Sequence, residues 1–549
     1  MRDGTVPILT RRRLLHGLAA IGGLGAAATG LRALGLLGGP AQADGATIEV
    51  LPPGSLAGRR VLVIGAGLAG LCSALRLARA GAEVEVLEAA VRAGGRSLTL
   101  RHGDRFTEIG WDAPTEMRFE GVGAVPPEHP GNHFNAGPSR IPYHHGRVLD
   151  WCRALGVALE PYVFATGANL MQNDAWNGGA PVQLRRLQHD LRGHLAELLA
   201  KAGPQQALDD ALAPAEVTAF LGMLTQFGQL STEGAELVYR AAAGYRLAPD
   251  GANGAGEPWP TLSLREILAS NFWRGGMFDE LQYTWQATLL QPAGGMDAIV
   301  RGFRAAAVPG GRSLGDLVAT GRAVRRLEQA DAHLVVTTAD GARATADFVV
   351  ATAAPPLLAQ WEGDALQPRA RQLLAGLGFM PACKVGWQAR SRFWETEDRI
   401  YGGISRTGHP IGEIGYPSSG FHGPTGVLTG AYIRGGSAAT FQRFSRADRL
   451  TIALEGGERL HPGFRDRVFA DNGVSVAWAR MPFQSGAWSF HSLRSEPALF
   501  ARLRDGDLVH PRVVLAGDWL SHWPGWQEGA LESAHAATDR VAAAAVAGR

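Results

Sequence analysis

The sequence has few residues that could cross-link the chain or give it an excess of charge. Three cysteines, Cys72, Cys152 and Cys383, occur in 549 residues, which is too few for a disulfide framework. The formal net charge at pH 7 is only +2, so no strongly basic composition points to a nucleic-acid partner. The hydrophobic fraction of 46% is ordinary for a folded protein, and the length favours two or three domains.

Lysine is also scarce, and so are groups of residues with the spacing needed to bind a metal ion. Lys201 and Lys384 are the only lysines, and every other basic residue apart from histidine is an arginine. Lys201 follows a helical surface pattern, whereas Lys384 lies in a strand-like stretch. The pair His144-His145 has no third and fourth ligand at a useful spacing. We therefore expect this pair at a helix start near a pocket, and we expect no metal site.

The first 43 residues are expected to be a targeting segment rather than part of the fold. Twin arginines, Arg11-Arg12, are followed by leucines and by a Gly/Ala/Leu-rich run, and residues 41–43 offer a small-residue cleavage site. The segment resembles a twin-arginine export signal. It predicts a periplasmic or secreted protein whose mature form has no membrane segment. An uncleaved membrane anchor and a disordered basic tail remain alternatives.

A glycine-rich turn between two apolar strands indicates a nucleotide-binding unit. Residues 61–64 have the pattern of a buried parallel strand, and Gly65, Gly67 and Gly70 then fit G-x-G-x-x-G at a helix start. Gly65 permits the turn, Gly67 lets the backbone approach a pyrophosphate, and Gly70 allows close packing of helix on strand. The next strand, residues 84–88, ends at Glu88, where a ribose-binding acid belongs.

Several of these segments together resemble one family. Residues 61–71, Glu88 and residues 94–97 are similar to the flavin amine oxidases, which include L-amino-acid oxidases, monoamine oxidases and amino-acid 2-monooxygenases. The resemblance implies FAD as the cofactor. It continues in residues 513–530, where a buried strand, a loop and a helix start follow one another. The residues implied to bind FAD are Gly65, Ala66, Gly67, Ala69, Gly70, Glu88, Ala89, Gly95, Arg96, Ser139, Arg140, Val324, Gly517, Asp518, Trp526, Gln527 and Ala530.

The resemblance covers nearly all of the chain after residue 43 and implies its architecture. The expected fold combines α/β and α+β parts. A Rossmann-like FAD-binding domain would comprise 56–105, 288–360 and 503–545, and a mixed-sheet substrate-binding domain 106–180 and 361–502. A helical domain, 181–287, would be inserted between them. Leucines at 184, 187, 191, 195 and 198 fall on one helical face, and residues 181–285 are predicted to be mostly helical.

Arg140 is the residue whose presence distinguishes between the possible substrate classes. Its segment, residues 137–142, resembles the amino-acid-oxidase motif whose arginine binds the substrate carboxylate. A guanidinium suits this task because its planar fork matches a carboxylate and keeps its charge. Tyr416 matches the tyrosine implied to donate a second hydrogen bond to the carboxylate. Trp523 and Trp526 are implied to line the pocket, with the carbonyl of Gly525 facing the substrate amine.

Lys384 is the third residue with an implied catalytic role, beside Arg140 and Tyr416. It matches the lysine that holds a water near flavin N5, a task that suits a compact ammonium. The structural alternatives are a surface or structural arginine for Arg140, a half-buried strand tyrosine for Tyr416, and a purely structural role for Trp523 or Trp526. Ser139 departs from the family pattern, which often has Met or Trp there, and this departure is expected to alter packing more than chemistry.

The predicted function is FAD-dependent oxidative deamination of L-amino acids. Hydride transfer from Cα to flavin N5 gives an imino acid, which water hydrolyses to a 2-oxo acid and ammonia, and dioxygen reoxidises the flavin to give hydrogen peroxide. The expected partners are an L-amino acid and dioxygen, and a homodimer is left open. Alternatives are an amide-forming L-amino-acid 2-monooxygenase, an amine oxidase without carboxylate recognition, and a flavin-bearing binding or scaffold protein.

Overall fold

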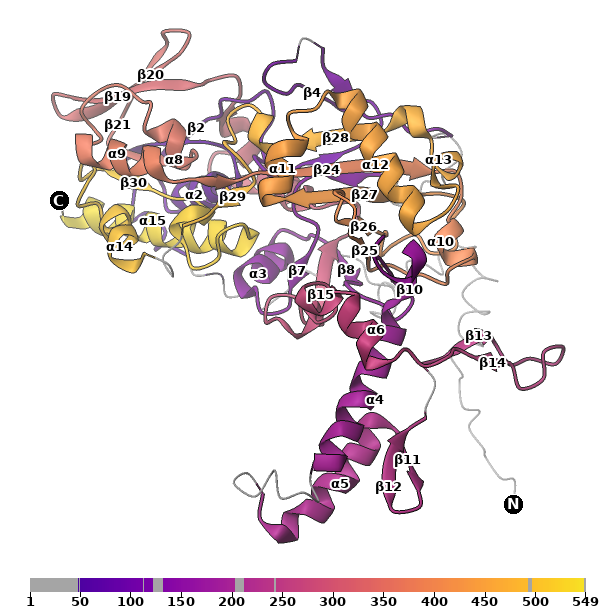
Figure 1. Ribbon diagram of the computed structural model, residues 1–549. Helices are drawn as coiled ribbons and strands as arrows, with labels where there is room; N and C mark the ends of the chain where they lie inside the picture. Colours follow the sequence, from indigo (N-terminus) through magenta and orange to yellow (C-terminus); the bar gives the residue numbers. More distant parts are fainter. Residues whose placement is uncertain are drawn as a thin grey trace, which may run out of the picture.

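The computed structural model describes residues 48, 50–111, 113–121, 132–202, 212–240, 243–491 and 496–547. They form a body with two large sheets, from which an arm projects (Figure 1). The predicted targeting segment lies outside these residues. Within the described part of the chain, no helix has both the length and the apolar run needed to cross a bilayer.

The nucleotide-binding unit is a five-stranded parallel sheet. Its order is β18 (Val318–Ala319), β2 (Glu83–Leu87), β1 (Arg60–Ile64), β22 (Phe348–Ala351) and β30 (Val513–Leu515). The central strands are apolar because both of their faces are covered. One face packs on α2 (Leu68–Arg79), α3 (Gly146–Ala154), α7 (Ala298–Ala305) and α15 (Gln527–Ala547).

The opposite face packs on a small antiparallel sheet and three helices. The sheet consists of β19 (Val324–Ala330), β20 (His333–Thr338) and β21 (Arg343–Ala346), and the helices are α8 (Pro355–Leu358), α9 (Pro368–Gly376) and α14 (Pro497–Asp505). The strand, glycine turn and helix predicted around Gly65 are therefore confirmed, and so is the second strand-to-helix block near the C-terminus.

The second large sheet is mixed and has seven strands. Its order is β10 (Val182–Gln183), β9 (Leu170–Gln172), β25 (Ile404–Thr407), β26 (Glu413–Gly415), β27 (Gly426–Arg434), β24 (Ala382–Ala389) and β28 (Val474–Ala477). Only the pair β9–β25 is parallel. Helices α10 (Phe393–Thr396), α11 (Gly435–Phe441), α12 (Arg446–Leu460) and α13 (Phe464–Arg467) pack against it around one apolar core. The predicted fold class is confirmed.

The projecting arm is less helical than the sequence predicts. It contains α4 (Leu184–Ala202) and α5 (Pro214–Gly228), followed by the hairpins β11 (Leu230–Glu233) with β12 (Glu236–Tyr239) and β13 (Tyr245–Leu247) with β14 (Glu257–Pro258) (Figure 1). The leucine face of α4 is buried only near the body. Leu184 and Leu187 are covered, whereas Leu195 and Leu198 are 43% and 52% exposed, because the arm leaves the body there.

Short elements connect these units. The chain returns from the arm through α6 (Leu264–Ala269) to β15 (Leu289–Pro292), which pairs with β7 (Ile141–Pro142) and β8 (Leu159–Tyr162). The remaining two-residue strands are β3 (Thr99–Leu100), β4 (Arg105–Phe106), β5 (Thr115–Glu116), β6 (Phe134–Asn135), β16 (Ala307–Val308), β17 (Arg312–Ser313), β23 (Phe379–Met380) and β29 (Trp488–Ser489). Single 3-10 turns span Asn177–Gly179, Phe272–Arg274, Asp279–Leu281, Leu314–Leu317, Ala470–Asn472, Trp478–Arg480 and Asp518–Leu520.

Candidate active site

A main cavity of about 450 Å³ is lined by residues of both large sheets. It begins where β1, β2 and β22 end, which is where open α/β sheets bind ligands. Most residues implied to bind FAD line this cavity, and they come from segments far apart in the chain. They are Gly65, Gly67, Ala69, Glu88, Ala89, Gly95, Arg96, Val324, Gly517, Asp518, Trp526, Gln527 and Ala530. Ala66, Gly70, Ser139 and Arg140 are not part of its lining.

The glycine turn shapes one wall of the main cavity. Gly65 has φ +103°, and a Cβ on Gly70 would lie 1.8 Å from the carbonyl oxygen of Gly65, so α2 can start this close to β1 only with glycine there. Around Gly67 no atom lies within 4 Å of where a Cβ would be. Gly67 also precedes α2 as an N-cap without a side-chain hydrogen bond. The helix start therefore offers backbone N–H groups to a phosphate.

Glu88 lies at the end of β2, as predicted. Its carboxylate accepts hydrogen bonds from the N–H groups of Ala66 at 2.6 Å and Ala90 at 2.8 Å. Burial raises the pKa of Glu88, and these N–H groups oppose the rise because they stabilise the anion. A buried acceptor held in this way at the cavity wall suits a ribose hydroxyl group.

The N-terminal and C-terminal blocks meet at an ion pair. The guanidinium of Arg96 contacts both carboxylate oxygens of Asp518, 422 residues away, and donates to the carbonyl of Ala487 at 2.8 Å. Asp518 also accepts the N–H of Gly525 at 2.9 Å. Next to this pair, Gln527 donates to Ser97 at 2.9 Å, while its buried Oε1 has no partner among the described residues. This lone acceptor in the cavity wall is available to a donor of a bound group.

These observations fit the FAD that the resemblance implies. The cavity offers a glycine-lined helix start for the pyrophosphate, the Glu88 carboxylate for the ribose, and the amide of Gln527 beside Trp526 for the flavin ring. The residues that would hold FAD are therefore already assembled by the fold. Within the described residues, no cluster of three or more His, Cys, Asp or Glu side chains could bind a metal ion.

Lys384 lies on β24, in the strand context predicted for it, and is 4% exposed. Its Nζ donates to the carbonyls of Gly137 at 2.6 Å and Asn135 at 3.1 Å, and to Ser139 Oγ at 2.8 Å. The ring of Tyr432 lies 4.9 Å from the same nitrogen. Burial, and secondly the positive charge of Arg140, lower the pKa of Lys384 to about 7.

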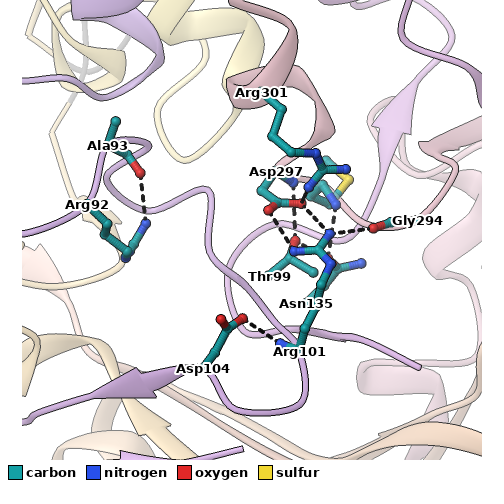
Figure 2. A network of polar contacts seen from close by, with 10 residues as sticks. Arg92, Ala93, Thr99, Arg101, Asp104, Asn135, Gly294, Asp297 and Arg301 are labelled. Carbon is teal, nitrogen blue, oxygen red and sulfur yellow. Dashed lines mark hydrogen bonds and ion pairs between the residues drawn. The ribbon is translucent and has the colours of Figure 1, made fainter. Parts of the chain in front are cut away.

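The backbone that receives Lys384 is fixed by a polar network. Figure 2 shows Asp297 between Arg101 and Arg301, with Thr99 and Asn135 beside it. Thr99 Oγ1 accepts the N–H of Asp297 at 3.1 Å and donates to Asn135 Oδ1 at 2.8 Å. The network joins segments that lie before and after the arm in the sequence. It holds the Asn135 peptide, whose carbonyl accepts a hydrogen bond from Lys384.

Arg140 presents a guanidinium surrounded by aromatic rings. Its Cζ lies 5.1 Å from the ring centre of Phe164, 5.2 Å from Trp285, and 5.9 Å from both Tyr162 and Trp526. Its Nε is buried without a hydrogen-bond partner, and no carboxylate of the described residues forms an ion pair with it. A half-buried positive charge of this kind is complementary to an anion brought by a ligand.

The structure does not place Tyr416 in the lining of the main cavity. Its hydroxyl donates to Ser405 Oγ at 2.8 Å and lies 2.7 Å from His461 Nε2, in the core under α12 and α13. The hydroxyl is therefore already engaged away from Arg140. Successive side chains of an extended chain alternate between faces, and sequence alone does not show which face of β26 turns to the cavity.

Another tyrosine, Tyr432, lies near both Lys384 and Arg140. It pairs with Lys384 across β24 and β27 and lines the main cavity. It is also close enough to Arg140 for that positive charge to act against the rise of its pKa. Burial raises the pKa of Tyr432, so its hydroxyl keeps its proton and can donate. Sequence analysis missed Tyr432 because its strand has an ordinary alternating pattern. Only the register of β27 against β24 places it beside Lys384.

The other implied substrate residues belong to an aromatic cluster. Gly525 and Trp526 line the main cavity. Trp523 does not line it, and instead its ring centre lies 5.4 Å from His145 and 5.7 Å from His144. Tyr283, from the segment that returns from the arm, lies 4.2 Å from His144.

His144 and His145 pack against the tryptophan rings of this cluster. His145 directly precedes α3, as predicted, and its ring lies 4.9 Å from Trp526. Burial, and then the neighbouring His144, lower the pKa of His145 to about 3, so the ring is neutral at ordinary pH. The cluster therefore joins three distant segments by packing and not by charge.

The chain is similar to known flavin-dependent and L-amino-acid oxidases over most of its length. The chain is 27% identical over 507 residues to the flavin-dependent L-tryptophan oxidase RebO of Lentzea aerocolonigenes, covering 88% of this chain and 98% of that protein. It is 26% identical over 512 residues to an L-amino-acid oxidase of Mus musculus, covering 88% of this chain and 70% of the relative.

Solved structures show the same fold. The cyclohexylamine oxidase from Brevibacterium oxydans IH-35A matches with a TM-score of 0.57 at 16% identity, covering 88% of this chain and 99% of that one. Among protein families, the one described as flavin containing amine oxidoreductase matches residues 68–542. The chain therefore belongs to the flavin containing amine oxidoreductase family.

Proposed function

We propose that this protein is an FAD-dependent L-amino-acid oxidase. The observation that carries the proposal is Arg140, a guanidinium beside the main cavity with no carboxylate partner of its own among the described residues. A substrate without an acid group would leave this charge unpaired, which costs free energy in a partly buried site. The similarity to oxidases of L-amino acids over most of the chain supports the same assignment.

Arg140 and Tyr432 would orient the substrate. The guanidinium would bind the carboxylate through two parallel hydrogen bonds, and the Tyr432 hydroxyl would donate a third. The carbonyl of Gly525, in the cavity wall, would accept a hydrogen bond from the neutral amine. Three fixed contacts determine the orientation of a tetrahedral Cα, so its hydrogen has one direction.

Bound FAD supplies the two-electron oxidation of the Cα–N bond and its own reoxidation by dioxygen. The chain contributes orientation and a dry site, because the rings around Arg140 and the cluster at Trp523 exclude water from the reacting carbon. Lys384 contributes a proton donor at the inner end of the cavity, since its pKa of about 7 lets it exchange protons near neutral pH. Hydrolysis of the released imino acid gives a 2-oxo acid and ammonia.

The test uses the wild-type holoenzyme under anaerobic conditions. A panel of L-amino acids, their D-enantiomers and the matching decarboxylated amines is mixed with it, and bleaching of the flavin absorbance is followed. L-amino acids should bleach the flavin fastest, and air should then yield hydrogen peroxide and the 2-oxo acid. Equal rates with the amines would assign the protein to the amine oxidases. An amide product would assign it to the amino-acid 2-monooxygenases.

We further propose export by the twin-arginine route. The support is the sequence Arg11-Arg12 followed by an apolar run and residues 41–43. A protein exported in this way is folded first, which suits an enzyme that must bind FAD. N-terminal sequencing of secreted material should begin near Asp44, and a start at Met1 would exclude cleavage.

A homodimer is proposed from the surface of the arm. Leu195, Leu198, Leu199, Met223 and Phe227 are exposed on α4 and α5, and clustered apolar side chains on a projecting element favour contact with a second copy. Sedimentation of the holoenzyme should give twice the mass of the chain. Replacement of Leu198 and Phe227 by aspartate should yield monomers, and a wild-type monomer would contradict the proposal.

A further inference from the structure

A second cavity, the rear cavity, is lined by Asn135 and Ser139, whereas residues 136–138 between them line the main cavity. Its volume is about 100 Å³, and the walls of the cavity carry many polar groups, among them Ser139, Tyr162, Gln291 and Thr429. Lys384 lines the main cavity and is absent from the rear one, whereas Ser139 lines the rear cavity and is absent from the main one. A water needs about 10–15 Å³ of such space and two to four polar partners, so the rear cavity can hold several waters.

Ser139 connects the two cavities through its hydroxyl. Its Oγ accepts a hydrogen bond from Lys384 Nζ at 2.8 Å, and its own hydroxyl hydrogen has no acceptor among the described residues. A hydroxyl both accepts and donates. Its free hydrogen can therefore bond to a water in the rear cavity while its lone pair receives Lys384.

The other groups around Lys384 cannot pass a proton onward. The carbonyls of Asn135 and Gly137 accept hydrogen bonds but carry no hydrogen, and Tyr432 presents its ring to the ammonium. The charged groups that act on Lys384 are Arg140, Arg434 on β27 and Glu413 on β26. Glu413 is held in ion pairs with Arg406 at 2.6 Å and Arg434 at 3.2 Å, so it is not a free base.

We propose that Ser139 is a positioning residue through which Lys384 exchanges protons with water in the rear cavity. The proposal rests on the proposed oxidase function. With FAD bound, transfer of two electrons from the reduced cofactor to dioxygen would give hydrogen peroxide and would take up one proton beyond the one that the cofactor carries. Lys384 donates that proton. Its amine then accepts the hydroxyl proton of Ser139 while a rear-cavity water returns a proton to Ser139 Oγ, and the hydroxide left by that water takes up a proton from the buffer, which supplies the net proton.

The first test measures reoxidation apart from amino-acid oxidation. The flavin of the holoenzyme is reduced photochemically without oxygen and mixed with oxygenated buffer in a stopped-flow instrument. Ser139→Thr keeps a hydroxyl, whereas Ser139→Val has nearly the same shape without one. The valine variant should reoxidise at least about tenfold more slowly than the threonine variant, with a larger solvent deuterium isotope effect. Equal rates and isotope effects in both variants would overturn the proposal.

The second test measures the titration of Lys384 directly by NMR and does not depend on enzymatic activity. Because the chain has two lysines, ¹³C-labelled lysine gives two side-chain signals in the oxidised holoenzyme, and Lys201→Arg assigns them. Loss of a hydrogen bond to the ammonium should lower the titration midpoint of Lys384 by about one to two pH units in Ser139→Val. Ser139→Thr should restore it, and an unchanged midpoint in Ser139→Val would contradict the contact.

The two proposals can fail separately. If no amino acid bleaches the flavin but the Ser139 variants behave as described, the oxidase assignment is wrong and the proton route stands. If amino acids are oxidised but the variants match the wild type, the oxidase assignment stands and the role of Ser139 is refuted. The flavin spectrum and the thermal unfolding midpoint of each variant verify that it is folded and holds FAD.

Discussion

Replacement of Arg140 by alanine tests the proposed carboxylate anchor. In the wild type the guanidinium is enclosed by the rings of Phe164, Trp285 and Trp526. Without it, the substrate carboxylate would enter this site unpaired. Breaking a buried charge pair costs about 3–5 kcal/mol, and each ~1.4 kcal/mol is a factor of ten. We therefore expect kcat/KM for an L-amino acid to fall by about two to four orders of magnitude.

The assay compares an L-amino acid with its decarboxylated amine on each variant. In Arg140→Ala the loss should be confined to the amino acid, because the amine makes no contact with the guanidinium. Arg140→Lys should recover only part of the rate, since a point charge lacks the planar fork. Arg153→Ala is the matched control. That side chain is 51% exposed on α3 and pairs with Asp150, and its removal should leave kcat/KM within about twofold of the wild-type value.

Two results would refute the reasoning. If Arg140→Ala loses the same factor on both substrates, the residue supports the fold of the site and not the carboxylate. If the wild type oxidises the amine as fast as the acid, the site does not recognise a carboxylate at all. The flavin spectrum should be unchanged in Arg140→Ala, because Arg140 does not line the main cavity, and loss of flavin would make the defect one of cofactor binding.

The remaining predictions concern four other groups. Tyr432→Phe should lower kcat/KM for L-amino acids by about tenfold, the value of one hydrogen bond to a charged group. Tyr416→Phe should instead mainly lower the midpoint of unfolding in urea. A larger loss of kcat/KM in Tyr416→Phe than in Tyr432→Phe would assign the carboxylate contact to Tyr416. Lys384→Met should leave FAD affinity unchanged and slow reoxidation in stopped-flow measurements. Because the protonated lysine is the donor and its pKa is about 7, the wild-type reoxidation rate should fall as pH rises through about 7, and a pH-independent rate would exclude this role. Arg449→Met leaves the fully buried carboxylate of Glu108 without its ion-pair partner, and with only the N–H of Ala477 as a donor among the described residues. The free energy of unfolding should therefore fall by about 3–5 kcal/mol in urea titration, and a change below about 1 kcal/mol would show that the pair is not stabilising.

Features built from neighbouring residues could be predicted from the sequence. The turn at Gly65, Gly67 and Gly70 is a local matter, because φ and close packing are decided by a missing Cβ and need no knowledge of the rest of the chain. The same holds for Glu88, which is placed by the length of β2. The buried strands could be predicted from runs of apolar residues, because a strand in a parallel sheet is covered on both faces.

The arm shows where such local patterns stop being informative. The leucine face of α4 correctly predicts a helix. It does not predict that Leu195 and Leu198 stay exposed, because periodicity describes one helix and not what packs against it. The hairpins β11–β12 and β13–β14 were missed for a related reason. Short strands carry a weak signal, and here they pair within the arm and not within a large sheet.

The sequence by itself determined the nucleotide-binding unit, the cofactor class and the presence of an arginine suited to a carboxylate. Only the tertiary structure decided which side chains surround that arginine. Tyr432, and not Tyr416, faces the site because the register of β27 against β24 sets it opposite Lys384. The contact of Ser139 with Lys384 joins positions 245 residues apart. Register and such long-range contacts depend on how whole sheets pack, and no local pattern of residues encodes that information.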